Sequence, residues 1–432
     1  MRSQMMRRGS WLFSLVLACV ATVTLAARSA LADVVVPLNQ TADTTLHTNG
    51  MVRAITQVGD RVYLGGRFTE LRERSIQKTG GATIAVANLG VLDAATGVGI
   101  GGFAPMVAGA TNPTIYAMAV WNQRLFVGGK FSSIDGVAAK NLAAIDVDPS
   151  SPSYGDVLPS FKPNPTGTVW GLAVGGSRLY AGGKFGKVGG VPHPNAARFT
   201  IAVDGTTTLD GSWNVATDGT TTEGGRVRDI QIDPDHPGSV YLVGHFYTVT
   251  DPVTTYNLRN IVRIGSGGRV DPSFSPPQGS FGISNFGIGA TVDAAMDRIF
   301  LGTGGSDWVA SYSTVNGDLD WKTDTNGQAQ AVTRLGDALI VGGHFKYAAY
   351  EPFYLSCGSN QDPAFCASRI RIAAFDPADG VLDLEWVPTV TGHYNGVWRA
   401  VPSSDGQQLW IGGELRFVTG VQHSYVARFS PP

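Results

Sequence analysis

Charged side chains are scarce in this 432-residue chain, at 15% of the residues against roughly 25% in an average globular protein. The formal net charge is −2, and no run of lysine and arginine follows the first ten residues. Broad electrostatic capture of nucleic acid or of an anionic membrane surface is therefore not expected. Beyond the N-terminal segment, the chain also lacks an apolar run long enough to span a bilayer, so we predict no stable membrane anchor.

The N-terminal segment has the pattern of a signal peptide. Three arginines among the first eight residues precede an apolar stretch, and Ala30-Leu31-Ala32 then supplies the small residues that signal peptidase favours. We predict a signal peptide over residues 1–32 and a secreted mature chain, residues 33–432, that forms a single domain. A retained membrane anchor is the competing interpretation. Arg7-Arg8 leaves open whether export follows the general secretory or the twin-arginine route.

Cysteine is almost absent. Cys19 falls in the predicted leader, which leaves only Cys357 and Cys366, close together in a polar segment. Two neighbouring cysteines in an exported protein predict a disulfide. A metal site would need more ligands, and no histidine lies nearby. We predict neither a metal nor a cofactor.

Glycine, by contrast, is abundant, with 56 residues. Many glycines belong to one repeated sequence pattern: an apolar strand, a polar turn, and a second strand that ends in Gly-Gly, a charged residue and Phe. The copies of the second strand, some degenerate, cover residues 60–68, 124–131, 178–185, 240–246, 297–303, 339–345 and 409–414. We expect the glycines to adopt backbone torsions that a Cβ forbids and to let neighbouring sheets approach closely.

Each copy continues into two more strands. A third resembles Asn141–Asp146, and a fourth begins with Asp and an aromatic residue, as in Asp271–Pro276. The copies lie roughly 58 residues apart on average, and four strands per repeat at such a spacing are typical of a β-propeller blade. The last copy stops after its third strand, whereas Val34–Leu38 is a spare β-rich segment. We therefore predict an all-β protein, a seven-bladed β-propeller of four-stranded antiparallel blades, whose ring is closed by the mature N-terminal strand.

The repeats resemble the Gly-Gly-x-Phe repeats, of the delta-sixty type, found in secreted bacterial proteins, especially those of actinobacteria. They are also similar to the extracellular repeats of fungal cortical markers of cell polarity and, more distantly, to kelch repeats. The resemblance covers residues 51–429 and implies the propeller fold without implying an activity. The chain departs from the pattern at Val243-Gly244, at Gly302-Thr303 and after Glu414, so the fifth and seventh blades are the least defined.

The first strands of a propeller's blades surround a central channel, and the copies align residues that would face it. One position holds Arg53, Tyr116, Trp170, Arg228, Ala290, Gln330 and Trp398. From this set we predict a ligand-binding platform, because aromatic faces stack on sugars and arginine offers a fork of donors. Its predicted residues are Arg53, Tyr116, Trp170, Arg228 and Trp398. The competing interpretation is that these side chains pack between blades or plug the channel.

A second aligned position follows the double glycine and is mostly basic. It holds Arg67, Lys130, Lys184, His245, Gly304, His344 and Glu414. These residues either gather an anionic ligand or pair with acidic groups of their own or the next blade.

The sixth repeat carries an insertion over residues 347–366. Tyr350, Phe353 and Tyr354 precede the predicted disulfide, and a stapled aromatic loop suits recognition of a protein or carbohydrate surface. A lid over an irregular blade is the alternative.

Signals of catalysis are weak. The sequence has no Gly-x-Ser-x-Gly elbow and no histidine motif for a metal, so we assign no catalytic residue and lean against an enzyme. Asp229 and Glu223 are the carboxylates that could still act in the channel. The leading hypothesis is a secreted, monomeric, non-catalytic recognition module that binds an extracellular glycan or protein at the propeller mouth. The alternatives are a secreted hydrolase or lyase for a sugar or lactone, and a structural cell-envelope protein.

Overall fold

A computed structural model of the chain describes residues 36–43, 46–73, 81–109, 111–219, 225–278, 286–305, 307–352, 357 and 362–432. Within these ranges the regular structure is almost all β-strand, and helix is confined to short 3-10 turns such as η3 (Ala294–Met296). No helix in the described ranges is long and apolar enough to cross a membrane.

Within the described residues, seven sheets share one plan, in which an inner, a second and a third strand pair antiparallel. The inner strands are β2 (Met51–Val58), β8 (Thr114–Trp121), β13 (Thr168–Gly175), β20 (Arg226–Ile232), β25 (Phe286–Asp293), β29 (Ala329–Leu335) and β34 (Val390–Pro402). The second strands are β3 (Arg61–Arg67), β9 (Arg124–Lys130), β14 (Arg178–Lys184), β21 (Val240–His245), β26 (Arg298–Gly304), β30 (Ala338–Gly343) and β35 (Leu409–Val418). The third strands are β6 (Leu89–Asp93), β12 (Leu142–Asp146), β17 (Ala196–Ile201), β24 (Ile261–Ile264), β27 (Trp308–Ser313), β33 (Ile372–Phe375) and β37 (Val426–Phe429).

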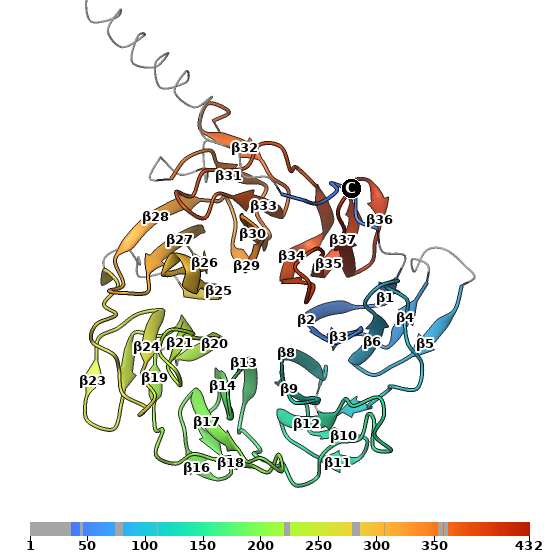
Figure 1. Cartoon of the computed structure of the whole chain (residues 1–432), viewed down its shortest axis with the longest axis vertical. Coiled ribbons are helices and arrows are strands. Elements are labelled where there is room, and N and C mark those ends of the chain that lie inside the picture. The colour runs from blue at the N-terminus through green and yellow to red at the C-terminus, as the bar shows by residue number, and fades with distance from the viewer. Residues whose placement is uncertain are drawn as a thin grey trace, which may run out of the picture. The chain divides into compact units, whose positions relative to one another are not determined.

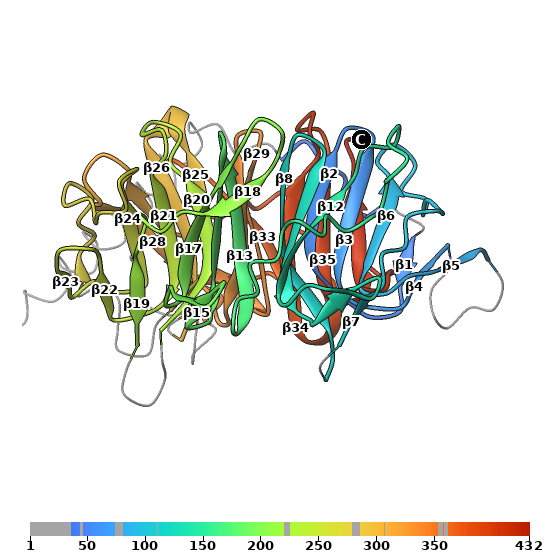
Figure 2. The same ribbon diagram turned by 90° about the horizontal axis from the view of Figure 1, so that it is seen from below.

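The inner strands surround a common axis. Each contacts the inner strands of the sheets before and after it, and β34 contacts β2. Figure 1 shows the sheets of residues 36–432 radiating from this axis, and Figure 2 shows β2, β8 and β13 from the side. The apolar cores lie between adjacent sheets, where for example Val91 of β6 and Ile115 of β8 share one buried cluster. The prediction of an all-β propeller is confirmed, and we number its blades in chain order from β2.

Short additional strands extend beyond the three-stranded plan. They include β1 (His47–Thr48), β4 (Glu70–Arg72), β5 (Thr83–Ala85), β7 (Val107–Ala108), β10 (Ser133–Ile134), β11 (Val137–Ala138), β15 (Lys187–Val188), β16 (Val191–Pro192), β19 (Ala216–Asp218), β22 (Thr248–Thr250), β23 (Thr255–Tyr256), β31 (Tyr347–Ala349), β32 (Cys366–Ser368) and β36 (Val421–Gln422). Figure 2 shows β1, β4, β15 and β22 among them toward one side of the blades.

The fourth strands are less regular than we predicted. Complete fourth strands occur in blades 3 and 5, as β18 (Thr207–Leu209) and β28 (Leu319–Asp324). Four other blades replace the strand by a single bridge, such as Ile264 to Val270 in blade 4. Prolines account for part of this difference: the segment after Val270 contains Pro272 and Pro276, which lack the N–H that a ladder requires.

In blade 7 the N-terminal segment takes the outer place. The N–H of Asn39 donates to the carbonyl of Ser430, and that of Asp43 donates to the carbonyl of Arg428, which brings residues 39–43 beside β37. The contacting residues therefore follow the Val34–Leu38 segment that we expected, and they form no regular strand. Val34 and Val35 lie outside the described residues.

A repeated ion pair explains why this segment fits blade 7. In blades 3 and 4 an arginine of the third strand binds an aspartate of the outer segment, with Nε–Oδ2 distances of 3.0 Å for Arg198 to Asp210 and for Arg263 to Asp271. Arg428 of β37 binds Asp43 in the same way, at 3.1 Å from Nε to Oδ1. The N-terminal segment thus supplies the carboxylate that blades 3 and 4 carry in their own outer segment.

The double glycines are required for close approach rather than for unusual torsions. Their φ angles are not positive, which corrects the first of our two expectations. A Cβ on the second glycine of blade 1, Gly66, would lie 2.0 Å from the carbonyl oxygen of Met51 on the paired inner strand. A Cβ on the first, Gly65, would lie 2.6 Å from Ile115 of the next blade. The glycines therefore admit a neighbouring carbonyl and a neighbouring side chain.

The sequence analysis missed an asparagine that joins successive blades. Asn88, Asn141, Asn195 and Asn260 all precede a third strand and have φ between 63° and 70°. The Asn141 side chain accepts a hydrogen bond from the N–H of Phe131 at 3.1 Å and donates to the carbonyl of Pro165 at 3.0 Å. Asparagine tolerates this left-handed conformation better than most residues, and its side chain bridges blade 2 to the segment that leads into blade 3.

The variant Asn141→Ala is expected to lower the free energy of unfolding by about 2–4 kcal/mol, because it adds backbone strain and leaves a buried carbonyl without its donor. Asn122→Ala is the matched control: Asn122 also has a positive φ, of 42°, but it is exposed and makes no side-chain hydrogen bond within the described ranges. Denaturant unfolding compares the two variants. Equal losses would show that the bridge to Pro165 contributes nothing.

Candidate functional site

Each inner strand has a register shift, which lies near the start of six strands and in the middle of the longer β34. In β2 the pairing with β3 skips Arg53, and the other six inner strands skip one residue in the same way. The skipped residues are Arg53, Tyr116, Trp170, Arg228, Ile288, Gln330 and Trp398. A bulge leaves one residue unpaired and re-aims its side chain, so these seven occupy one level of the axis. In blade 5 the residue is Ile288 rather than Ala290, because Gly287 and Gly289 flank the shift.

Arg53 lies between two aromatic rings of this level. Its guanidinium carbon is 3.8 Å from the ring centroid of Trp398 and 5.6 Å from that of Tyr116. Its Nε donates to the sulfur of Met51 at 2.6 Å. Burial lowers the pKa of Arg53 to about 10, while Tyr116 and Glu414 act in the opposite direction. The guanidinium therefore keeps its charge at neutral pH.

Arg228 makes the equivalent stack with other rings. Its guanidinium carbon lies 5.4 Å from the ring centroid of Trp170 and 5.2 Å from that of Phe286. Burial, together with repulsion by Arg226 and Arg53, lowers the pKa of Arg228 to about 10. The structure thus brings together all five residues that we predicted for ligand binding, as two arginines held by aromatic rings.

Two donors at this level have no acceptor in the described part of the chain. They are the buried Nε of Arg228 and the buried indole Nε1 of Trp398. A buried N–H without an acceptor costs free energy, and a ligand oxygen could supply the missing partner.

The predicted basic ring lies beside this level. Arg67 pairs with Met51 at the start of β2, and Lys130 and Lys184 have the equivalent places in blades 2 and 3. All three side chains are exposed, and no ion pair is found for them within the described residues. We call this end of the channel, where the inner strands begin, the basic end. The opposite end, where each inner strand turns into its second strand, is the hairpin end.

The remaining members of the basic ring differ. Arg226 contacts His245 with 2.9 Å between Nη2 and Nδ1, and the ring of His245 lies 5.5 Å from that of Phe286. Glu414 accepts a hydrogen bond from the N–H of Asn395 at 3.1 Å. Glu414 is the one carboxylate of the aligned set, so the ring as a whole remains basic.

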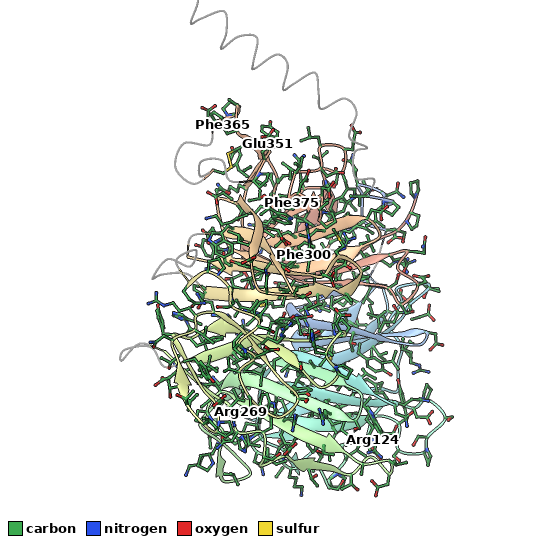
Figure 3. The ribbon with its side chains drawn as sticks, turned by 60° about the vertical axis from the view of Figure 1, so that its left-hand side comes forward. Arg124, Arg269, Phe300, Glu351, Phe365 and Phe375 are labelled. Carbon is green, nitrogen blue, oxygen red and sulfur yellow. A yellow bond between two sulfur atoms is a disulfide. The ribbon has the colours of Figure 1, made fainter. Side chains whose placement is uncertain are left out.

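The sixth-blade insertion contains the disulfide that we predicted. A disulfide joins Cys357 to Cys366, and β31 pairs with β32 beside it. Tyr350 is half-buried against the core, so part of its ring serves packing rather than recognition. Figure 3 shows Phe365 and Glu351 on this insertion. Phe353 and Tyr354 lie outside the described residues.

One charged channel residue was missed by the sequence analysis. Arg399 of β34 lines a cavity with Asp229, which we had singled out; Glu223 lies outside the described residues. Comparing the residue after each bulge across the repeats would have exposed Arg399, but the bulges become visible only when the strands are paired. No group of three or more potential metal-binding side chains occurs in the described ranges.

No protein-family model and no curated protein matches the sequence. Among solved structures, the chain is similar to the WD40 β-propeller domain of Doa1, with 12% identity and a TM-score of 0.49 over 90% of this chain and 96% of that chain. It is also similar to the computationally designed Ika8 protein, with 12% identity and a TM-score of 0.48 over 90% and 99% of the two chains. A third likeness is to the extracellular domain of a one-component system from B. thetaiotaomicron, with 12% identity and a TM-score of 0.45 over 90% of this chain and 40% of that chain. Such distant likenesses carry no conclusion about function, and the delta-sixty resemblance stays a prediction.

Proposed function

We propose that this chain is a secreted binding module that holds an acidic glycan at the basic end of its central channel. The observation that carries the proposal is the pair of arginines, Arg53 and Arg228, each fixed by two aromatic rings and each charged at neutral pH. Stacking limits the motion of a guanidinium. Its N–H groups, which lie in the plane of the guanidinium, stay available to a carboxylate or sulfate.

Charge at the rim supports an anionic ligand. Arg67, Lys130 and Lys184 are exposed around the mouth and would attract an acidic polymer before it reaches the arginines. The free donors of Arg228 and Trp398 offer two further hydrogen bonds to glycan oxygens. The predicted leader and the Cys357–Cys366 disulfide fit an extracellular ligand.

A binding role is favoured over the two alternatives. A hydrolase or lyase would need an acid and a base within reach of one bond, whereas the channel cavity holds a single carboxylate, Asp229, which already accepts three hydrogen bonds. A purely structural protein would have no need of charged residues stacked on its axis. Burying a charge costs free energy, and the lowered pKa of both arginines reflects that cost.

The proposal predicts that the mature chain binds polygalacturonate and alginate but not neutral dextran. Arg228→Gln should weaken binding roughly tenfold or more, since charge-assisted bonds are the strong ones. Trp398→Phe keeps the ring and removes only the indole donor, so it should cause a smaller loss. Binding is measured by titration calorimetry at two salt concentrations, and added salt should weaken it.

Arg61→Gln is the matched control for these variants. Arg61 also stacks on an aromatic ring, 4.9 Å from the centroid of Tyr154, but it begins β3 at the opposite, hairpin end. Equal affinity for dextran and polygalacturonate would contradict the proposal. So would full binding by the Arg228→Gln variant, or failure of the wild-type chain to bind either acidic polymer.

A further inference from the structure

The residue that follows the bulge is small in most inner strands. In five blades it is Ala54, Ala117, Gly171, Gly289 or Ala331. A Cβ on Gly289 would lie 2.5 Å from the carbonyl oxygen of Gln330 in the next inner strand, so the neighbouring blade leaves little room here. The two exceptions are Asp229 in blade 4 and Arg399 in blade 7. The repeated scaffold does not account for two charged side chains at a position that is otherwise Gly or Ala.

Asp229 is buried and held by three hydrogen bonds. Its Oδ1 accepts from the N–H of Ile230 at 2.9 Å, and its Oδ2 accepts from the N–H of Ala290 at 2.9 Å and from Nε2 of Gln231 at 3.0 Å. Burial raises the pKa of Asp229, and the charge of Arg399 and these hydrogen bonds oppose that rise. The carboxylate is therefore fixed in place with little capacity left for another donor.

Arg399 is half-buried and faces open space. It lines a cavity of about 400 Å³ together with Asp229 and with residues of the inner strands β8, β13, β20 and β25. Val120, Val174 and Val292 place this cavity toward the hairpin end of the channel. In the described ranges Arg399 makes no side-chain hydrogen bond and no ion pair within 4 Å, so its donors remain available to a ligand.

We infer that this cavity is a second binding site, which takes a small hydroxylated monocarboxylate, a sugar acid, through Arg399. The planar guanidinium matches a carboxylate with two parallel hydrogen bonds. A volume of about 400 Å³ lies within the range of small-molecule sites and fits a single sugar residue rather than a folded polymer. The residues that line the cavity include none of the bulge residues, which separates this site from the basic end.

The neighbouring carboxylate decides which anion the site accepts. Asp229 and Arg399 together give the cavity little net charge, so a monoanion is tolerated, whereas a phosphate dianion would be repelled by Asp229. An amino-acid zwitterion is disfavoured as well, because the oxygens of Asp229 already accept three hydrogen bonds. Hydroxyl groups suit the rest of the ligand, since each inner strand is an end strand of its sheet and has no strand partner on one edge.

The test compares D-galacturonate with D-galactose and galactose 1-phosphate, titrated into the mature chain and followed by calorimetry. Galacturonate should bind, and the other two should bind at least roughly tenfold more weakly, as expected for loss of a charge-assisted pair of hydrogen bonds. Arg399→Ala installs a residue that three other blades carry at this position, so folding should persist while galacturonate binding falls by a similar factor. Arg399→Lys should retain part of the affinity, because it keeps the charge and loses the fork.

Arg124→Ala is the control, since Arg124 begins β9 at the hairpin end and does not line the cavity. Unchanged galacturonate binding by Arg399→Ala would overturn the inference. The same holds if galactose or galactose 1-phosphate binds as tightly as galacturonate, or if the wild-type chain binds no galacturonate. Because galacturonate is also the repeating unit of the polymer proposed for the basic end, the titrations are repeated in the Arg228→Gln variant, where galacturonate binding that depends on Arg399 should remain.

Discussion

Replacing Gly287 by valine should destabilise the protein by about 2–3 kcal/mol, because it overpacks a buried contact between blades 4 and 5. A Cβ at Gly287 would lie 2.5 Å from Cγ1 of Val243 and 3.1 Å from the carbonyl oxygen of Asn260. Val243 is fully buried, with 0% of its surface exposed, so it has no open space into which to move.

Val243→Gly, in turn, should cost about 3 kcal/mol, through the cavity that it creates and the flexibility of glycine. The double variant Val243→Gly/Gly287→Val should be more stable than either single variant. It would restore the arrangement seen at five other interfaces, where a glycine of one blade faces a β-branched residue of the next, as Gly182 faces Val227 at 2.5 Å. Unfolding free energies of the four proteins give the coupling energy directly.

A distant pair provides the control for this cycle. A Cβ at Gly342 would lie 2.5 Å from Cγ1 of Val397 in blade 7, so Gly342→Val should clash there, and that interface shares no residue with Val243. The effects of Gly342→Val and Val243→Gly should therefore add. If the losses of Val243→Gly and Gly287→Val also simply add in their double variant, the two residues do not compensate each other.

Val243 and Gly287 also show what the sequence could and could not predict. The repeat of apolar strands and double glycines was enough to predict the propeller, because the pattern recurs in every blade, with degenerate copies in the fourth and fifth. Val243, in the fourth blade, stood out as a departure from it. Its partner, Gly287, could not be recognised from the sequence, since the compensation depends on which side chains face each other across two sheets.

The candidate site shows the same limit. Aligning the repeats found Arg53, Tyr116, Trp170, Arg228 and Trp398, because they follow a conspicuous apolar residue at the start of each inner strand. In blade 5 the alignment selected Ala290, two residues past Ile288, because two glycines there obscure the strand start. Whether these side chains bind a ligand stays a prediction.

A second large effect is expected from Arg263→Met, which should lower the free energy of unfolding by about 3–5 kcal/mol because it removes the buried guanidinium beside Asp233. The Asp233 carboxylate then keeps two backbone N–H groups and the half-exposed ring of His236 as partners. Only 1% of the Arg263 side chain is exposed, and its Nη1 lies 3.5 Å from Oδ2 of Asp233, whose side chain is 0% exposed. Nε binds Asp271 at 3.0 Å, and Nη1 donates to the carbonyl of Thr314 in the next blade at 2.6 Å. One side chain thus joins two carboxylates and two blades.

Arg198→Met is the matched control, because Arg198 occupies the same place in blade 3 and ion-pairs with a single carboxylate. Its partner Asp210 is 18% exposed, so water can replace the lost arginine there, whereas the side chain of Asp233 is 0% exposed. The loss in Arg198→Met should therefore be smaller. If a stranded charge causes the larger loss, then Arg263→Met/Asp233→Asn should be more stable than Arg263→Met alone, because the amide carries no charge to bury. A double variant no more stable than the single one would assign the loss to packing and to the bond with Thr314 instead.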